Sequence, residues 1–216
     1  MEYSDVIENW KHFADAITKI GGEVQALSIE EPATEDEVAI LESKLGFDLP
    51  QSLKEVLLCF SKKVEFRWFM PASYELQGEL SQIFSGERLW SLDWLVELNE
   101  AKNDVRDGLF PNKEDLYDVV WHNKLAFQDV GNGDYLAIDL SRPGQEPVVY
   151  LSHDGGDGHG VKMAKNFKEF VFLSSRLGCV GAEDWQWLPF VEEGVPFINA
   201  NSDNAYKFRE ALGVKA

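Results

Sequence analysis

The sequence is poor in cysteine and contains no long apolar run. Only two cysteines, Cys59 and Cys179, occur among 216 residues, and both lie in apolar patterns with helical spacing. We interpret both as small buried hydrophobic residues in a reducing compartment, and we do not expect a disulfide. No apolar run approaches the roughly 18 residues that a membrane helix needs. The first residues are acidic, unlike the basic and apolar parts of a secretory signal, so we predict a cytoplasmic protein.

Motifs that mark common enzymes and cofactor sites are also missing. There is no phosphate-binding loop, nucleophile elbow, zinc-protease helix motif or Cys-x-x-Cys pair. Gly131-Asn132-Gly133 begins like a dinucleotide-binding motif, but Leu136 replaces its third glycine and a strand is expected where the motif needs a helix. An EF-hand beginning at Asp129 fails because Leu140 stands where that loop needs a glutamate. We therefore expect no catalytic residue, no cofactor and no metal.

One polar segment could nevertheless carry chemistry. His153, Asp154, Asp157 and His159 lie together in a glycine-rich stretch. Two imidazoles and two carboxylates can bind zinc, or place a general base beside an acid, so a metal-dependent enzyme is kept as the weakest of three hypotheses. We favour a plain connection whose short polar side chains cap their own backbone, since a flexible glycine-rich loop opposes preorganised metal geometry.

Negative charge dominates the sequence. The chain has 38 acidic and 20 basic residues, a net charge of −18, and residues 1–60 contribute 13 acidic and 4 basic residues. A field of this sign repels nucleic acid and anionic lipid and attracts basic proteins. We predict a protein partner of basic character, with no direct contact to nucleic acid or membrane. The simpler alternative is that the acidity only keeps the protein soluble.

Apolar spacing and turn residues predict a mixed fold. Helices are expected over residues 6–20, 38–45, 50–60, 89–105, 166–177, 184–191 and 204–212, and strands over 64–70, 125–130, 134–140 and 147–152. Thr34 and Glu37 form a capping-box pattern before the second helix. The predicted class is α+β, with an antiparallel sheet of about four to six strands and helices at the N- and C-terminal ends. Leu136 and Ile138 should face the core, and Tyr135 and Ala137 should lie on the opposite, unburied face.

The seven tryptophans divide by their surroundings. Trp10 and Trp94 fit apolar helix faces and are expected in the core. Trp68 follows an arginine on a predicted strand, so that one of the two can face water. For Trp185 and Trp187, which follow two acidic residues, burial in the core is favoured, and partly exposed interface anchors are the alternative.

Several short motifs, taken in order, resemble the SUKH superfamily of Smi/Knr-type domains. They cover about residues 28–177 and comprise Glu31–Val38, Leu41-Glu42, Leu45-Gly46, Leu49-Pro50, Val130–Leu140, Pro147–Tyr150, His153-Asp154, Asn166-Phe167 and Glu169-Phe170. On this resemblance we expect an N-terminal helical extension over 1–27, a SUKH-like α+β domain over 28–180, and a C-terminal helical extension over 181–216 packed on the same domain.

The resemblance implies an α+β fold without a known active site. Bacterial members of the superfamily commonly act as immunity proteins that neutralise toxins, and fungal members regulate cell-wall synthesis through protein contacts. The leading hypothesis is therefore an immunity protein that binds a basic toxin domain, and a regulatory scaffold is the alternative. The expected contact residues are Glu35, Asp36, Trp68, Asp154 and Asp157.

Overall fold

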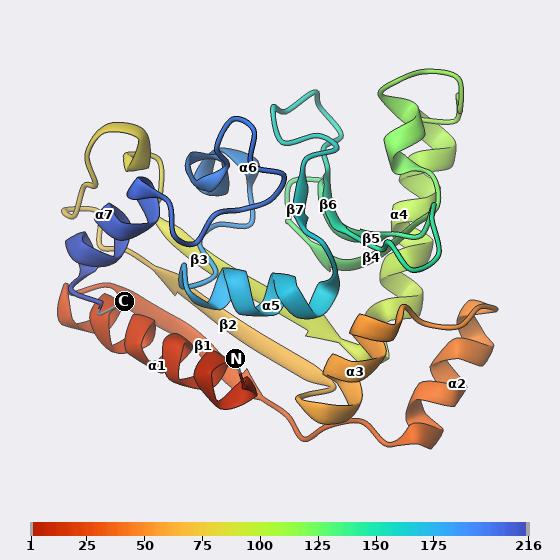
Figure 1. The fold of residues 1–216 in the computed structure, drawn as a ribbon, viewed down its shortest axis with the longest axis horizontal. Coiled ribbons are helices and arrows are strands. Elements are labelled where there is room, and N and C mark those ends of the chain that lie inside the picture. The colour runs from red at the N-terminus through yellow and green to blue at the C-terminus, as the bar shows by residue number, and fades with distance from the viewer. Residues whose placement is uncertain (1, 215–216) are drawn as a thin grey trace.

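The computed structural model describes residues 2–214, with helices at both ends of the chain and strands between them (Figure 1). The α-helices are α1 (Tyr3–Lys19), α2 (Glu35–Leu45), α3 (Gln51–Cys59), α4 (Leu95–Leu109), α5 (Phe167–Ser175), α6 (Asp184–Trp187) and α7 (Asp203–Leu212). The strands are β1 (Glu23–Ile29), β2 (Lys63–Phe69), β3 (Ser85–Ser91), β4 (Lys124–Asp129), β5 (Tyr135–Asp139), β6 (Val148–Leu151) and β7 (Lys162–Ala164). Short 3-10 helices are η1 (Gly78–Leu80), η2 (Leu92–Trp94), η3 (Asp118–Trp121) and η4 (Leu188–Phe190).

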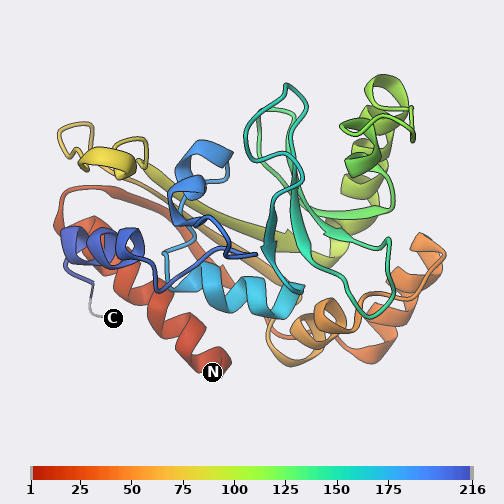
Figure 2. The ribbon, with the colours of Figure 1, turned by 45° about the horizontal axis from the view of Figure 1, so that its top comes forward.

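The strands form two antiparallel sheets, which confirms the α+β class with helices at both ends. The first sheet has the order β1-β2-β3, and the second has the order β4-β5-β6-β7. The sheets adjoin at β3 and β4, where Leu89 N–H donates to Gln128 Oε1 at 3.2 Å. In Figures 1 and 2 the second sheet rises from the β3 side of the first, beside α4. No helix within residues 2–214 has the length and apolar character to cross a bilayer.

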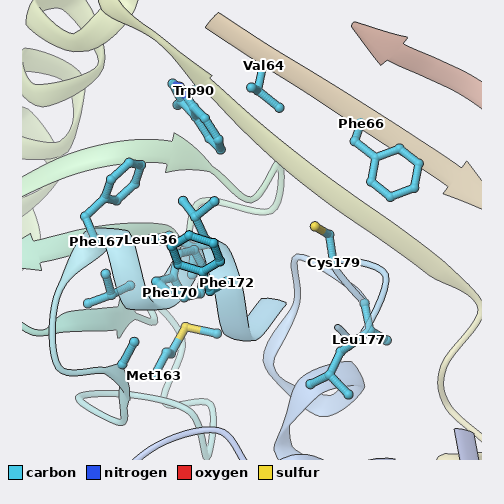
Figure 3. Packing of buried hydrophobic residues seen from close by; sticks show 14 of the residues in the cluster. Val64, Phe66, Trp90, Leu136, Met163, Phe167, Phe170, Phe172, Leu177 and Cys179 are labelled. Atoms are coloured by element: carbon cyan, nitrogen blue, oxygen red, sulfur yellow. The ribbon is translucent and has the colours of Figure 1, made fainter. Parts of the chain in front are cut away.

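Aromatic side chains join the first sheet to its covering helices. Trp10 in α1 lies 5.8 Å from Phe66 on β2, and Phe167 in α5 packs edge-on against Trp90 on β3 at 5.6 Å. Figure 3 shows Phe66, Trp90 and Phe167 projecting into the same space between sheet and helix. Since such rings also bury large apolar areas, this layer supplies much of the driving force for folding.

The second sheet is buried on both faces, contrary to the single buried face that we predicted. Leu136 and Ile138 face the main core as expected. Tyr135 and Ala137 face the other way and are also buried, because α4 and η3 cover that side with a smaller apolar cluster. The alternating pattern of β5 could not reveal this second cover, because tyrosine and alanine are compatible with either environment.

Local signals fix the ends of α2 and its link to α3. Thr34 Oγ1 accepts from Glu37 N–H at 3.2 Å, and the Glu37 carboxylate accepts from Thr34 N–H at 2.7 Å, so the predicted capping box is present. Glu42 then accepts from Leu49 N–H at 2.9 Å and lies 3.3 Å from Lys54 Nζ. The Leu-Glu and Leu-Pro motifs are thus physically connected, because one carboxylate holds the turn between two helices.

Three strands were not predicted. β1 lies in a stretch that we interpreted as a polar connection, and β7 has only three residues. The helix predicted from residue 89 is wrong at its start, since β3 occupies residues 85–91 and α4 begins at Leu95. Each of these segments pairs with a more strongly patterned strand, and that pairing outweighs weak local propensity.

Two predictions of burial are wrong. Trp94 is 46% exposed rather than part of the core, although Trp10 is fully buried. Cys59 is exposed at the end of α3, whereas Cys179 is buried, and both thiols are free. Trp94 belongs to η2, so the helical spacing on which its burial was predicted does not apply there.

One continuous apolar core reaches from α1 to α7. It includes Val6 near the N-terminus and Leu212 near the C-terminus, and Phe13 stacks on Phe208 at 5.9 Å. The first 27 residues contain a strand as well as a helix, because β1 begins at Glu23. The division into a central domain and two extensions stays a prediction.

A buried lysine on the inner face of α4 leads to a prediction about pH. Lys102 is fully buried, and its ammonium donates to Lys124 O at 2.7 Å. Burial, followed by the nearby charges of Arg106 and Lys124, lowers the pKa of Lys102 to about 7. Between pH 7 and 10 the unfolded chain therefore binds more protons than the folded chain, so the free energy of unfolding rises with pH.

We expect that rise to reach about 2 kcal/mol between pH 7 and 9 in urea unfolding, and to be absent in Lys102→Met. Lys113→Met, which removes an exposed lysine, should keep the rise. A Lys102→Met protein with the same pH dependence as the native chain would contradict the assignment.

Candidate functional site

The loop between β6 and β7 is held in place by hydrogen bonds despite its four glycines. Ser152 Oγ accepts from Gly156 N–H at 3.0 Å and donates to Asp154 Oδ1 at 2.9 Å. Asp184 at the start of α6 accepts from Gly158 N–H at 2.8 Å. A Cβ on Gly158 would lie 2.5 Å from the Cβ of Asp184, so only glycine allows the loop to approach α6 this closely.

Asp134 anchors the same loop from the β4–β5 turn. This carboxylate is 3% exposed. Its Oδ1 accepts from the backbone N–H of His153 at 2.8 Å and lies 2.7 Å from His153 Nδ1. Its Oδ2 accepts from Tyr150 Oη at 2.7 Å and from Asn132 Nδ2 at 3.1 Å. Burial and the adjacent carboxylate raise the pKa of the Tyr150 hydroxyl, which keeps it a donor.

His159 serves the packing of the loop. Its ring stacks on Tyr117 with centroids 3.7 Å apart. Nδ1 accepts from Ser152 N–H at 3.1 Å, so Nε2 carries the proton and donates to Tyr117 O at 3.0 Å. Burial lowers the pKa of His159, which favours this neutral form. With both ring nitrogens occupied, His159 has no free atom for a metal or a substrate.

A trio of possible metal ligands occurs in this region, formed by Asp134, His153 and Asp154. Asp134 and His153 bond to each other, and Asp154 accepts from Ser152 through one oxygen. The Asp134 carboxylate receives four hydrogen bonds, which is the number of lone-pair sites that it offers. A metal would have to displace a buried donor, so the trio is better explained as a structural network than as a metal centre.

Trp185 stands at the centre of the acidic surface that the loop creates, and its side chain is 43% exposed. Trp185 and Leu188 form the shared wall of two hollows. One hollow has a volume of about 380 Å³ and the other of about 690 Å³. We call this region the Trp185 surface. Its charged residues are seven acids and one base, namely Asp134, Asp154, Asp157, Asp184, Glu79, Glu192, Asp203 and Lys207.

The local potential of this surface is negative. Glu183 precedes α6, and its pKa is raised by burial and then by the charges of Asp134 and Asp184. Asp154 and Asp157 are exposed at the rim. Protein hydrogen bonds occupy only one Asp154 oxygen and neither Asp157 oxygen in the described chain. An exposed indole beside two exposed carboxylates with free oxygens, Asp154 and Asp157, is suited to binding cationic and aromatic groups of a partner.

The predicted contact residues do not form one site. Asp154 and Asp157 lie on the Trp185 surface, but Glu35 and Asp36 are exposed on the first turn of α2, at another end of the molecule (Figures 1 and 2). The hollow beside α2 is smaller, about 270 Å³, and includes Lys44 in its wall. Trp68 is fully buried, and its Nε1–H donates to Gly178 O at 2.7 Å, so its prediction as a contact residue is wrong.

The structure adds acids that were not among the predicted contact residues. Asp134 and Asp184 line the first hollow, and Glu79 reaches the second from η1. The exposed Trp185 and the buried Trp187 resolve the alternatives left open for this pair. The acidic residues before Trp185 were the available signal. Glu79 of η1 comes close to Trp185 only through tertiary packing, which no local sequence motif indicates.

Comparison with known families supports the resemblance. Residues 32–172 match the family model described as SMI1 / KNR4 family (SUKH-1). The match includes Glu42, Asp134 and the loop after β6, whose structural roles are described above. No curated protein matches the chain.

The Asp134 network predicts a large effect on stability. We expect Asp134→Asn to lower the free energy of unfolding by about 2–3 kcal/mol, because an amide places a donor where two donors already converge. Asp157→Asn, at an exposed carboxylate without hydrogen bonds, should change it by less than about 0.5 kcal/mol. Urea unfolding followed by tryptophan fluorescence measures both, and equal effects would contradict the role of Asp134.

The occupied ligand atoms predict weak metal binding. Calorimetric titration of zinc into the purified chain should show no stoichiometric site near neutral pH. Asp154→Asn is the matched variant, because it removes the one partly free carboxylate of the trio. Stoichiometric zinc binding that this substitution abolishes would instead support the metal hypothesis.

Proposed function

This chain belongs to the SMI1/KNR4 (SUKH-1) family, and we propose that it is a non-enzymatic binding protein that neutralises a basic toxin domain by direct contact. The observation that supports the proposal is the Trp185 surface, where one exposed indole lies among seven acids and a single lysine. An immunity protein needs no chemistry of its own, since covering the toxin's active site is sufficient.

Asp154, Asp157 and Trp185 are the contact residues that we propose. Trp185 provides a large, rigid anchor, and binding hot spots are enriched in tryptophan. Asp154 and Asp157 offer carboxylate oxygens that are free to accept from lysine or arginine. We place the contact here rather than on α2, because Lys44 and Lys62 partly neutralise the acids near that helix.

The negative charge of the chain supports inhibition in two ways. At long range it steers a basic partner, and electrostatic steering can raise association rates to about 10⁸–10⁹ M⁻¹s⁻¹ at low salt. At contact, carboxylates occupy positions where a nuclease would hold substrate phosphates. Both effects weaken as salt screens the charges.

The hydrogen-bonded loop favours tight binding. Ser152, Asp184 and Asp134 hold the segment that carries Asp154 and Asp157 before any partner arrives. Little loop entropy is therefore lost on association, and more of the contact energy appears as affinity. The free thiols of Cys59 and Cys179 agree with a cytoplasmic location, which we also propose.

The decisive experiment is co-purification with the product of the neighbouring gene, followed by an assay of that product's toxicity or nuclease activity. We expect a complex that silences the activity and whose affinity falls at least about tenfold between 50 and 500 mM salt. The double variant Asp154→Lys/Asp157→Lys should lose about a hundredfold or more in affinity, and Trp185→Ala about tenfold or more.

The matched control is Glu35→Lys/Asp36→Lys, which makes the same change of charge on α2. It should alter affinity only through the long-range field, by less than about tenfold. A larger loss in this control than in the loop variant would move the contact to α2. A complex without inhibition would instead support the regulatory scaffold.

A further inference from the structure

β1 is an edge strand with one open side. The sheet order places β2 on one side of β1 and no strand on the other. Across residues 2–214, no hydrogen bond apart from the β1–β2 ladder reaches residues 23–29. Figure 1 shows β1 at the margin of the first sheet, beside α1.

The pairing register shows which backbone groups point outward. Glu30 N–H donates to Lys63 O at 2.9 Å, so residue 30 faces β2. Antiparallel ladders alternate, and Leu27 lies opposite Phe66 while Ile29 lies opposite Val64. The N–H and C=O groups of Leu27 and Ile29 therefore point away from β2, two residues apart, in the spacing that another strand requires.

The core beneath this edge is incomplete. Residues directly opposite each other lie on the same face of a sheet, so Val24, Leu27 and Ile29 face the core with their partners on β2. The β2 partners Phe66 and Val64 are fully buried, whereas Leu27 is 36% exposed. Val24 and Ile29 are also only partly buried. A further strand would cover these side chains.

Edge strands normally carry features that prevent pairing, such as charged residues, proline or a bulge. β1 has a bulge at Gln25, where the register shifts between Val24 and Ala26. From Ala26 to Ile29 the ladder is regular, and the sequence Ala-Leu-Ser-Ile contains neither charge nor proline. This half of the strand is unprotected against a partner strand.

We propose that the outer edge of β1 is a docking site for an extended segment of a basic protein, which adds a strand beside residues 26–29. Main-chain hydrogen bonds to Leu27 and Ile29 would supply affinity, and apolar side chains would cover Leu27. Glu23 and Glu31 are exposed at the two ends of the strand, so the segment carries lysine or arginine on both flanks. A second copy of the chain is disfavoured by its net charge of −18.

This inference depends on the proposed function only for the positive charge of the partner. The edge lies on β1, whereas the toxin-binding surface is formed by the β6–β7 loop and α6. A test with a synthetic strand therefore distinguishes failure of the edge from failure of the immunity hypothesis.

The probe is a short peptide of alternating valine and threonine between terminal lysines, titrated into the full ¹⁵N-labelled chain. We expect shifts at the amides of Leu27 and Ile29 and about tenfold slower hydrogen exchange there. The control peptide has the same sequence with N-methylated backbone, so it keeps the charge and the side chains but cannot complete a ladder. It should cause neither change.

Two variants of the chain test whether the peptide binds at Leu27. Leu27→Lys should abolish peptide binding, while Gln25→Lys, with the same charge change at the bulge, should retain most of it. Equal binding of the N-methylated peptide, or shifts confined to the β6–β7 loop and α6, would overturn the proposal. Protection of Leu27 and Ile29 that grows with protein concentration without peptide would assign the edge to a second copy and equally overturn it.

Discussion

The buried carboxylate of Asp134 is the interaction on which the proposed binding region depends. It ties the β4–β5 turn to Tyr150 on β6 and to the backbone of His153 at the start of the next loop. That loop in turn meets α6 through Asp184 and Gly158. Removing water from a carboxylate is costly, and only several converging donors offset that cost. The Gly-Asp and His-Asp motifs of this chain therefore have an architectural role.

Burial changes how the charge of the chain is distributed. Arg88, Lys102 and Arg209 are buried, and none of them takes part in an ion pair among residues 2–214. Their donors reach backbone carbonyls and an amide oxygen instead, and burial lowers the pKa of each. The buried charged residues are four basic ones, Arg88, Lys102, Lys124 and Arg209, and two acidic ones, Asp134 and Asp184. A partner therefore meets a surface somewhat more negative than the composition suggests.

Sequence patterns were sufficient where local chemistry decides structure. The capping box at Thr34, the apolar face of α1 and the β4–β5–β6 meander were all predictable, because their signals lie within a few residues. The weak strands β1 and β7 were not, since each depends on a neighbouring strand for its hydrogen bonds. The site was only partly predictable. Asp154 and Asp157 lie in one loop, but their grouping with Glu79 and Trp185 is created by tertiary packing.

The contact between α1 and α7 has a consequence for biosynthesis. Phe13 and Phe208 stack in one core, although nearly the whole chain separates them in sequence. During translation, α1 emerges from the ribosome long before the helix that completes its packing. Until α7 follows, Phe13 lacks part of its final cover, although β1, β2 and α5 already provide partners for the rest of the helix. The packing of α1 is therefore completed only after translation has reached α7.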